Sequence, residues 1–204
     1  NNTTITVTFS EAVYNTNSGS GSLEVSDFVF ALSGGNATLS STTPSSISIN
    51  GNEYTLGISL SGTPNGSETL TVNPVSSSIY DIAGNVASTS QSNNSISLND
   101  KLAPTMTISS STVNSGEKSN DSTISLTFTS SESTTNFIKD DITISGGSLS
   151  SLSGSGTTYT ATLTPSGDAT YTINVAQNKF TDSAGNNNSA SNTFTWTYDS
   201  TAPT

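Results

Sequence analysis

The sequence predicts an all-β chain in which two β-sandwich units follow one another, and two observations support this prediction. Short runs in which apolar and polar residues alternate recur throughout the 204 residues, and Gly, Asn, Ser and Asp separate these runs. Such alternation is typical of half-buried strands. The sequence also repeats: Asp100–Thr105 returns as Asp199–Thr204, and Asp81–Asn85 returns as Asp182–Asn186, each about 100 residues later. The repeat indicates two units, each of a common domain size.

The first unit consists of short alternating segments. Residues Thr3–Val13 place Ile5, Val7 and Phe9 on one face, which predicts a half-buried strand. Asn50–Asn52 has the composition of a hairpin turn. Further strands are expected at Asp27–Leu32, Ala37–Leu39, Ile47–Ile49, Tyr54–Leu60, Leu70–Tyr80 and Ile96–Leu98.

The second unit repeats this order with one addition. Met106 and Ile108 form an opening strand that has no counterpart in the first unit. The later strands are expected at Ile124–Phe128, Asp141–Ile142, Tyr159–Leu163, Tyr171–Val175 and Phe194–Tyr198. About seven short strands per unit, with turn signals between them, predict a two-sheet sandwich of the immunoglobulin type.

Because the opening strand is missing from the first unit, the ends of the chain are not expected to coincide with the boundaries of its domains. We expect residues 1–101 to form an immunoglobulin-like domain without its opening strand, and residues 102–200 to form a complete one. Residues 201–204 are expected to begin the first strand of a further repeat. Two explanations remain open. The chain boundary falls inside a domain, or the first unit takes its missing strand from another chain.

The composition excludes several classes of function. The net charge is −11, and all four basic residues are lysines. Because nucleic acids and anionic membrane surfaces require cationic contacts, neither is an expected partner. The chain has no His and no Cys, so Ser-His and Cys-His nucleophile pairs and the usual zinc ligands are absent, and no catalytic residue is assigned. Its acidic surface, rich in Ser, Thr, Asn and Gly, favours a secreted or cell-surface protein, and no segment long enough to span a membrane is present.

Five motifs stand out, most of them in the second unit: TFSE (Thr8–Glu11), DITISGG (Asp141–Gly147), YTATLTP (Tyr159–Pro165), F-x-D-x-AGN (Phe180–Asn186) and YDSTAPT (Tyr198–Thr204). Together they resemble the bacterial immunoglobulin-like (Big-type) tandem repeats of large secreted or cell-surface adhesins. The resemblance covers nearly all of the second unit, whereas the first unit departs from the pattern in its longer middle section. It implies that calcium binds between neighbouring domains.

Carboxylates from distant parts of the sequence are expected to meet at one end of each unit. When the strands are followed in order, the loop after the second strand and the loop before the last strand lie at the end where the unit begins. In the second unit this end gathers Asp100, Glu132, Asp140 or Asp141, and Asp182. The same reasoning gathers Glu11, Asp27 and Asp81 in the first unit, and gives Asp199 to a unit beyond the chain.

Such a concentration of negative charge costs Coulomb energy unless a cation is present. Calcium takes six to eight oxygen ligands and tolerates irregular geometry, so Ca²⁺ is the expected cofactor. An alternative remains open for Asp81 and Asp182, because Asp at the start of a D-x-A-G-N turn also binds backbone N–H groups.

Three functions compete. The first is a non-enzymatic spacer and adhesion module of a long extracellular protein, with calcium stiffening the joint between neighbouring repeats. The second is a subunit of an extracellular filament or sheath in which copies of the chain exchange strands. The third is a module that binds carbohydrate or a cell-surface protein. Phe194 and Trp196 alternate within a strand, which favours positions in the core and at its rim over a sugar-binding platform. A glycosidase-type pair of acids is the weakest hypothesis, because loops this short form no deep cleft.

Overall fold

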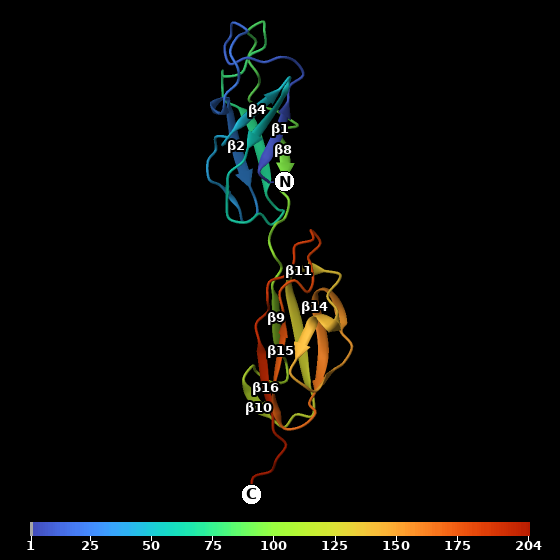
Figure 1. Ribbon diagram of the computed structural model, residues 1–204. Coiled ribbons are helices and arrows are strands. Elements are labelled where there is room, and N and C mark those ends of the chain that lie inside the picture. The colour runs from blue at the N-terminus through green and yellow to red at the C-terminus, as the bar shows by residue number, and fades with distance from the viewer. Residues whose placement is uncertain (1) are drawn as a thin grey trace. The chain divides into compact units, whose positions relative to one another are not determined.

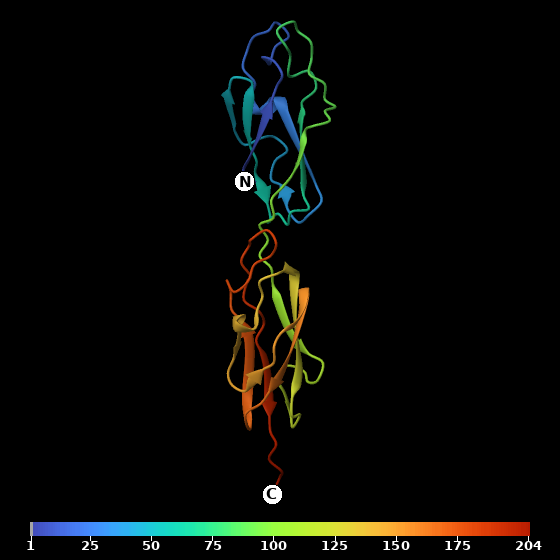
Figure 2. The same ribbon diagram turned by 90° about the vertical axis from the view of Figure 1, so that its right-hand side faces the viewer.

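The computed structural model describes residues 2–204 (Figures 1 and 2). The chain divides into two compact units, Asn1–Leu102 and Ala103–Thr204, a division one residue later than the boundary expected from the sequence. The described part is built from strands and two short 3₁₀ helices, so the predicted all-β, immunoglobulin-like sandwich fold is confirmed. No helix in residues 2–204 is long and apolar enough to cross a membrane.

The first unit forms two three-stranded sheets and a short strand pair. One sheet has the order β1-β5-β4, the other has the order β2-β7-β8, and β3 pairs with β6. The elements are β1 (Thr4–Thr8), η1 (Val25–Asp27), β2 (Phe28–Ser33), β3 (Thr38–Leu39), β4 (Ile47–Asn50), β5 (Glu53–Gly57), β6 (Leu60–Ser61), β7 (Thr69–Pro74) and β8 (Ser95–Ser97). The predicted hairpin turn at Asn50–Asn52 joins β4 to β5, where Asn50 lies opposite Glu53.

The second unit forms two four-stranded sheets. Their orders are β13-β14-β11-β9 and β10-β16-β15-β12. The elements are β9 (Met106–Ser110), β10 (Glu117–Ser119), β11 (Ile124–Thr134), η2 (Lys139–Asp141), β12 (Ile142–Ile144), β13 (Ser148–Leu149), β14 (Ser153–Thr164), β15 (Ala169–Val175) and β16 (Phe194–Tyr198). The opening strand expected at Met106 is β9, and it pairs antiparallel with β11.

Each unit has its own hydrophobic core, filled by the inward-facing residues of its two sheets. In the first unit Phe30, Leu56, Leu70 and Ile79 are almost completely buried. In the second unit the fully buried Trp196 packs beside Tyr171, and its indole Nε1–H donates to Ser119 Oγ at 3.0 Å. Trp196 and Phe194 were predicted at the core and its rim, and both are buried in the core.

Strand lengths differ from the expectation in both directions. The strand expected over Thr3–Val13 ends at Thr8, because its partner β5 starts at Glu53 and leaves the later residues without a strand to pair with. The strand expected over Leu70–Tyr80 ends at Pro74, which lacks a backbone N–H for the ladder. In the second unit, β11 continues past Phe128 to Thr134.

Candidate metal centre

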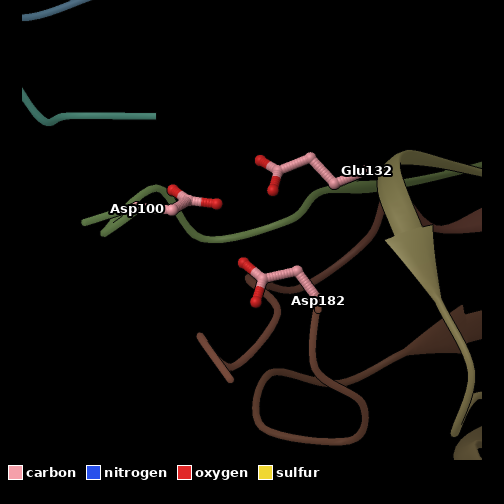
Figure 3. A group of neighbouring side chains, drawn as sticks. All are labelled: Asp100, Glu132 and Asp182. Carbon is pink, nitrogen blue, oxygen red and sulfur yellow. The ribbon is translucent and has the colours of Figure 1, made fainter. Parts of the chain in front are cut away.

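Three carboxylates predicted as ligands, those of Asp100, Glu132 and Asp182, lie close together. One oxygen from each lies within 4.8 Å of one oxygen from each of the others, and Figure 3 shows the three groups turned toward one another. Asp182 is buried, and the other two are half-buried. No other such group of three or more acidic side chains occurs among residues 2–204.

The spacing of these oxygens fits one calcium ion. Calcium binds oxygens at about 2.3–2.6 Å, so two ligands of one ion lie at most about 4.6–5.2 Å apart. The observed spread of 4.8 Å falls within this limit. Carboxylates are hard oxygen ligands, and three of them would supply roughly three to six of the six to eight oxygens that calcium takes. The sequence has neither His nor Cys, so the set does not suit zinc.

Local backbone features orient the side chains of Glu132 and Asp100. Glu132 lies in β11 between Thr129 and Thr134, where the register with β14 shifts. A shift of this kind bends a strand and redirects a side chain that regular pairing would place elsewhere. Asp100 follows β8, and its Oδ1 accepts the backbone N–H of Leu102 at 2.8 Å. This side-chain turn fixes the carboxylate and leaves Oδ2 for another contact.

Asp182 is held by its own loop. Its Oδ1 accepts the Asn186 backbone N–H and its Oδ2 accepts the Asn186 Nδ2–H, each at 2.9 Å. The corresponding loop of the first unit has the same bonds, at 2.8 and 2.7 Å, from Asn85 to Asp81. There the Asn85 side-chain bond leads the contacts that lower the pKa of Asp81. The turn-forming role expected as an alternative is therefore present in both loops, and only Asp182 has two further acids beside it.

The acids predicted for the first unit do not form a comparable group. Glu11 is exposed. Asp27 ends the 3₁₀ helix η1, where its Oδ2 accepts the Glu24 N–H at 2.7 Å, and burial raises its pKa. Asp81 is bound within its own loop. In the described part of the chain these three carboxylates are not brought together as a ligand set.

The remaining predicted ligands also have local partners or face solvent. Asp141 repeats the role of Asp27, because its Oδ2 accepts the Ile138 N–H at 2.9 Å at the start of η2. Asp140 is exposed on the same helix. Asp199 forms an ion pair with Lys118, which leads the contacts that lower its pKa.

Two acidic residues with clear structural roles were missed by the sequence reasoning. Glu68 is completely buried, and its carboxylate accepts backbone N–H groups from two separate loops. Asp168 accepts the Ser200 N–H and hydroxyl at 2.8 Å and the Thr201 hydroxyl at 2.6 Å. Led by the Thr201 bond, these contacts lower the pKa of Asp168 to about 2. Each carboxylate has partners about 30 residues away in sequence, Asn36 and Ala37 for Glu68 and Ser200 and Thr201 for Asp168, so no local pattern marks these contacts.

Part of the chain matches a known protein family. Residues 100–198 match the family model described as a bacterial Ig-like domain, and this range contains all three clustered acids. Curated proteins gave no match to the chain.

Proposed function

Because residues 100–198 match the model of a bacterial Ig-like domain, we propose that the protein is a non-enzymatic repeat module of a bacterial extracellular or cell-surface protein, and that calcium binds to Asp100, Glu132 and Asp182. The single observation behind the calcium proposal is the convergence of these three carboxylates. The acidic composition and the lack of His and Cys support a structural rather than a catalytic role.

The energetic reason for a cation is mutual repulsion. Two unit charges about 5 Å apart repel by about 3 kcal/mol at an effective dielectric constant near 20, and water around half-buried groups reduces this figure. Asp182 is buried, so its charge is the least screened of the three. A divalent ion would convert this repulsion into attraction.

The mechanical consequence follows from where the ligands lie in the chain. Asp100 belongs to the segment before β9, Glu132 to β11, and Asp182 to the loop before β16. One ion would therefore restrain three segments that are far apart in sequence. Pro104 already narrows the conformational range of the segment, and its carbonyl accepts the Ser189 N–H at 3.0 Å. Restraint of this segment would stiffen a spacer made of such repeats.

The expected stabilisation is modest. Extracellular calcium modules have dissociation constants of roughly 10⁻⁴–10⁻³ M. At 10 mM calcium, mass action then gives about 1–3 kcal/mol, or about 4–15 °C in melting temperature for a unit of this size.

Thermal unfolding followed by the fluorescence of Trp196, the sole tryptophan, tests this proposal in the second unit. Calcium should raise the melting temperature of the wild-type chain and EDTA should reverse the rise. Glu132→Gln keeps the side-chain shape and should abolish the calcium response. It should not lower stability in EDTA, because it removes one repelling charge. Asp140→Asn, at an exposed position outside the cluster, is the matched control and should respond like the wild type. If 10 mM calcium leaves the melting temperature of the wild-type chain unchanged, calcium binding is refuted.

Carbohydrate or receptor binding has less support. The ring that would serve best as a sugar platform, Trp196, is completely buried. Strand exchange between chains would involve a different surface, the edge of β1 in the first unit.

A further inference from the structure

One strand edge is uncovered in the first unit, whereas the corresponding edge of the second unit has a partner strand of its own. In the second unit, β11 lies between two partners, β14 on one side and β9 on the other. In the first unit, β1 pairs with β5, and residues 2–204 supply no strand on its other side. Figure 1 shows β1 and the short β8 near each other at this side of the unit. An uncovered strand edge presents backbone groups that can pair with another strand.

The β1–β5 pairing determines which residues of β1 direct their backbone groups to the uncovered edge. The Phe9 N–H donates to Asn52 O, and Thr3 O accepts the Ile58 N–H, so odd-numbered residues face β5. In an antiparallel strand, alternate residues direct their backbone groups to opposite sides. Thr4, Thr6 and Thr8 therefore direct theirs to the uncovered edge.

A groove of about 600 Å³ lies along this edge. Its walls are β1, the end of β7, β8 and the loop before β8, and Phe28 also lines it. The residues that line it include no charged side chain. Gln91 and Asn93, which carry side-chain amides, are among the lining residues.

The burial of paired residues shows that the groove is a gap in the sandwich. Ile96 of β8 lies opposite Leu70 of β7, so both face the interior. Leu70 is 0 % exposed, but Ile96 is 52 % exposed and lines the groove. At the corresponding pair of the second unit, Trp196 lies opposite Tyr171 and is 0 % exposed. The interior of the first unit is thus uncovered along this line.

We propose that this groove binds an extended segment of the β9 type, laid antiparallel on β1 so that its alternate apolar side chains cover Ile96 and the inner face of β1. The segment Ala103–Thr112 serves as the example of such an occupant, because it contains β9, which pairs with β11 in the second unit. It carries no charged side chain, and neither do the residues that line the groove. The second unit also shows how an amide can hold such a strand. Asn192 accepts the Ile108 N–H at 2.7 Å and donates to Ile108 O at 2.9 Å. Gln91 and Asn93 line the groove with the same chemistry.

The test uses the full chain and a synthetic peptide of residues 103–112, added at up to about 1 mM because single strands bind weakly. The peptide is also fused before Asn1 through a flexible Gly-Ser linker, which raises its local concentration. Binding should shift NMR signals of β1 and β8 and slow hydrogen exchange at the Thr6 and Thr8 amides. The fusion should raise the melting temperature of the first unit.

Two controls make the test specific. A peptide with Met106→Asp and Ile108→Asp should bind at least about tenfold more weakly, because it would bury two charges. On the protein, Ile96→Lys should weaken binding to a similar extent, whereas Ile49→Lys, at a similarly exposed position outside the groove, should not. No response to either the free or the fused peptide would overturn the proposal. Dimerisation of the chain alone, with Thr6 and Thr8 protected, would also overturn it and assign the edge to a second copy.

Discussion

Replacement of Glu68 by Gln should strongly destabilise the first unit, although the two side chains have the same shape. Glu68 is 0 % exposed, and its Oε1 accepts the N–H groups of Asn36 at 2.7 Å and Ala37 at 3.0 Å. Its Oε2 accepts the Asn65 N–H at 3.0 Å. A glutamine amide has one acceptor oxygen, so its NH₂ group would face at least one of these donors.

The size of the effect follows from these contacts. Hydrogen bonds to a charged group contribute about 1.5–3 kcal/mol each, and a buried donor without a partner costs about 1–3 kcal/mol. Because water can reach loops that move apart, we expect a net loss of about 2–3 kcal/mol. For a unit of about 100 residues this lowers the melting temperature by about 8–15 °C.

Calorimetry of both proteins between pH 2 and pH 7 provides the measurement. Burial alone would raise the pKa of Glu68, but the bonds from Ala37, Asn65 and Asn36 outweigh it, and the pKa is lowered from 4.5. A lowered pKa in the folded state gives stability that is present above the unfolded-state value and is lost as the pH falls through the folded-state value. The difference between wild type and variant should therefore shrink below about pH 4.5.

The exposed Glu53 is the matched control, since Glu53→Gln removes the same charge in the same unit. Its effect should stay within about 0.5 kcal/mol. If Glu68→Gln melts like Glu53→Gln at neutral pH, the carboxylate does not hold these loops together.

Two further variants test the second unit. Trp196→Ala should cost about 3–5 kcal/mol in urea unfolding followed by circular dichroism, because it empties a fully buried site; an unchanged midpoint would contradict its core position. Asp168→Asn should destabilise the chain end near Ser200 above pH 4 and make little difference near pH 2, since the pKa of Asp168 is lowered to about 2 and its contribution is lost as the pH falls through that value. Faster hydrogen exchange at the Ser200 and Thr201 amides at neutral pH would be the measured sign, and unchanged exchange would contradict it.

The sequence predicts the fold because strand signals are local. Alternating residues mark β1, β5 and β15, and the Asn50–Asn52 turn marks a hairpin, with no need to know what lies opposite. Strand ends are harder, because they depend on the partner. The strand starting near Thr3 stops where β5 stops supplying a ladder, and nothing in residues 9–13 shows this.

For the candidate site, too, some features follow from the sequence and others do not. The order of strands brings Asp100, Glu132 and Asp182 to one end, and the structure places their oxygens together, although calcium binding stays a prediction. Asp27 and Asp141 were included because they lie near the same ends. Each instead caps a one-turn 3₁₀ helix, and a three-residue helix leaves no periodic pattern in a sequence.

Crystallography of the protein grown in 10 mM CaCl₂, with anomalous data that identify calcium, is the most direct test of the proposed function. We expect one ion bound by an oxygen each of Asp100, Glu132 and Asp182 at about 2.3–2.6 Å, with backbone or water oxygens completing six to eight ligands. A well-ordered map in which these carboxylates hold no ion, or in which calcium binds only elsewhere, would contradict the proposal.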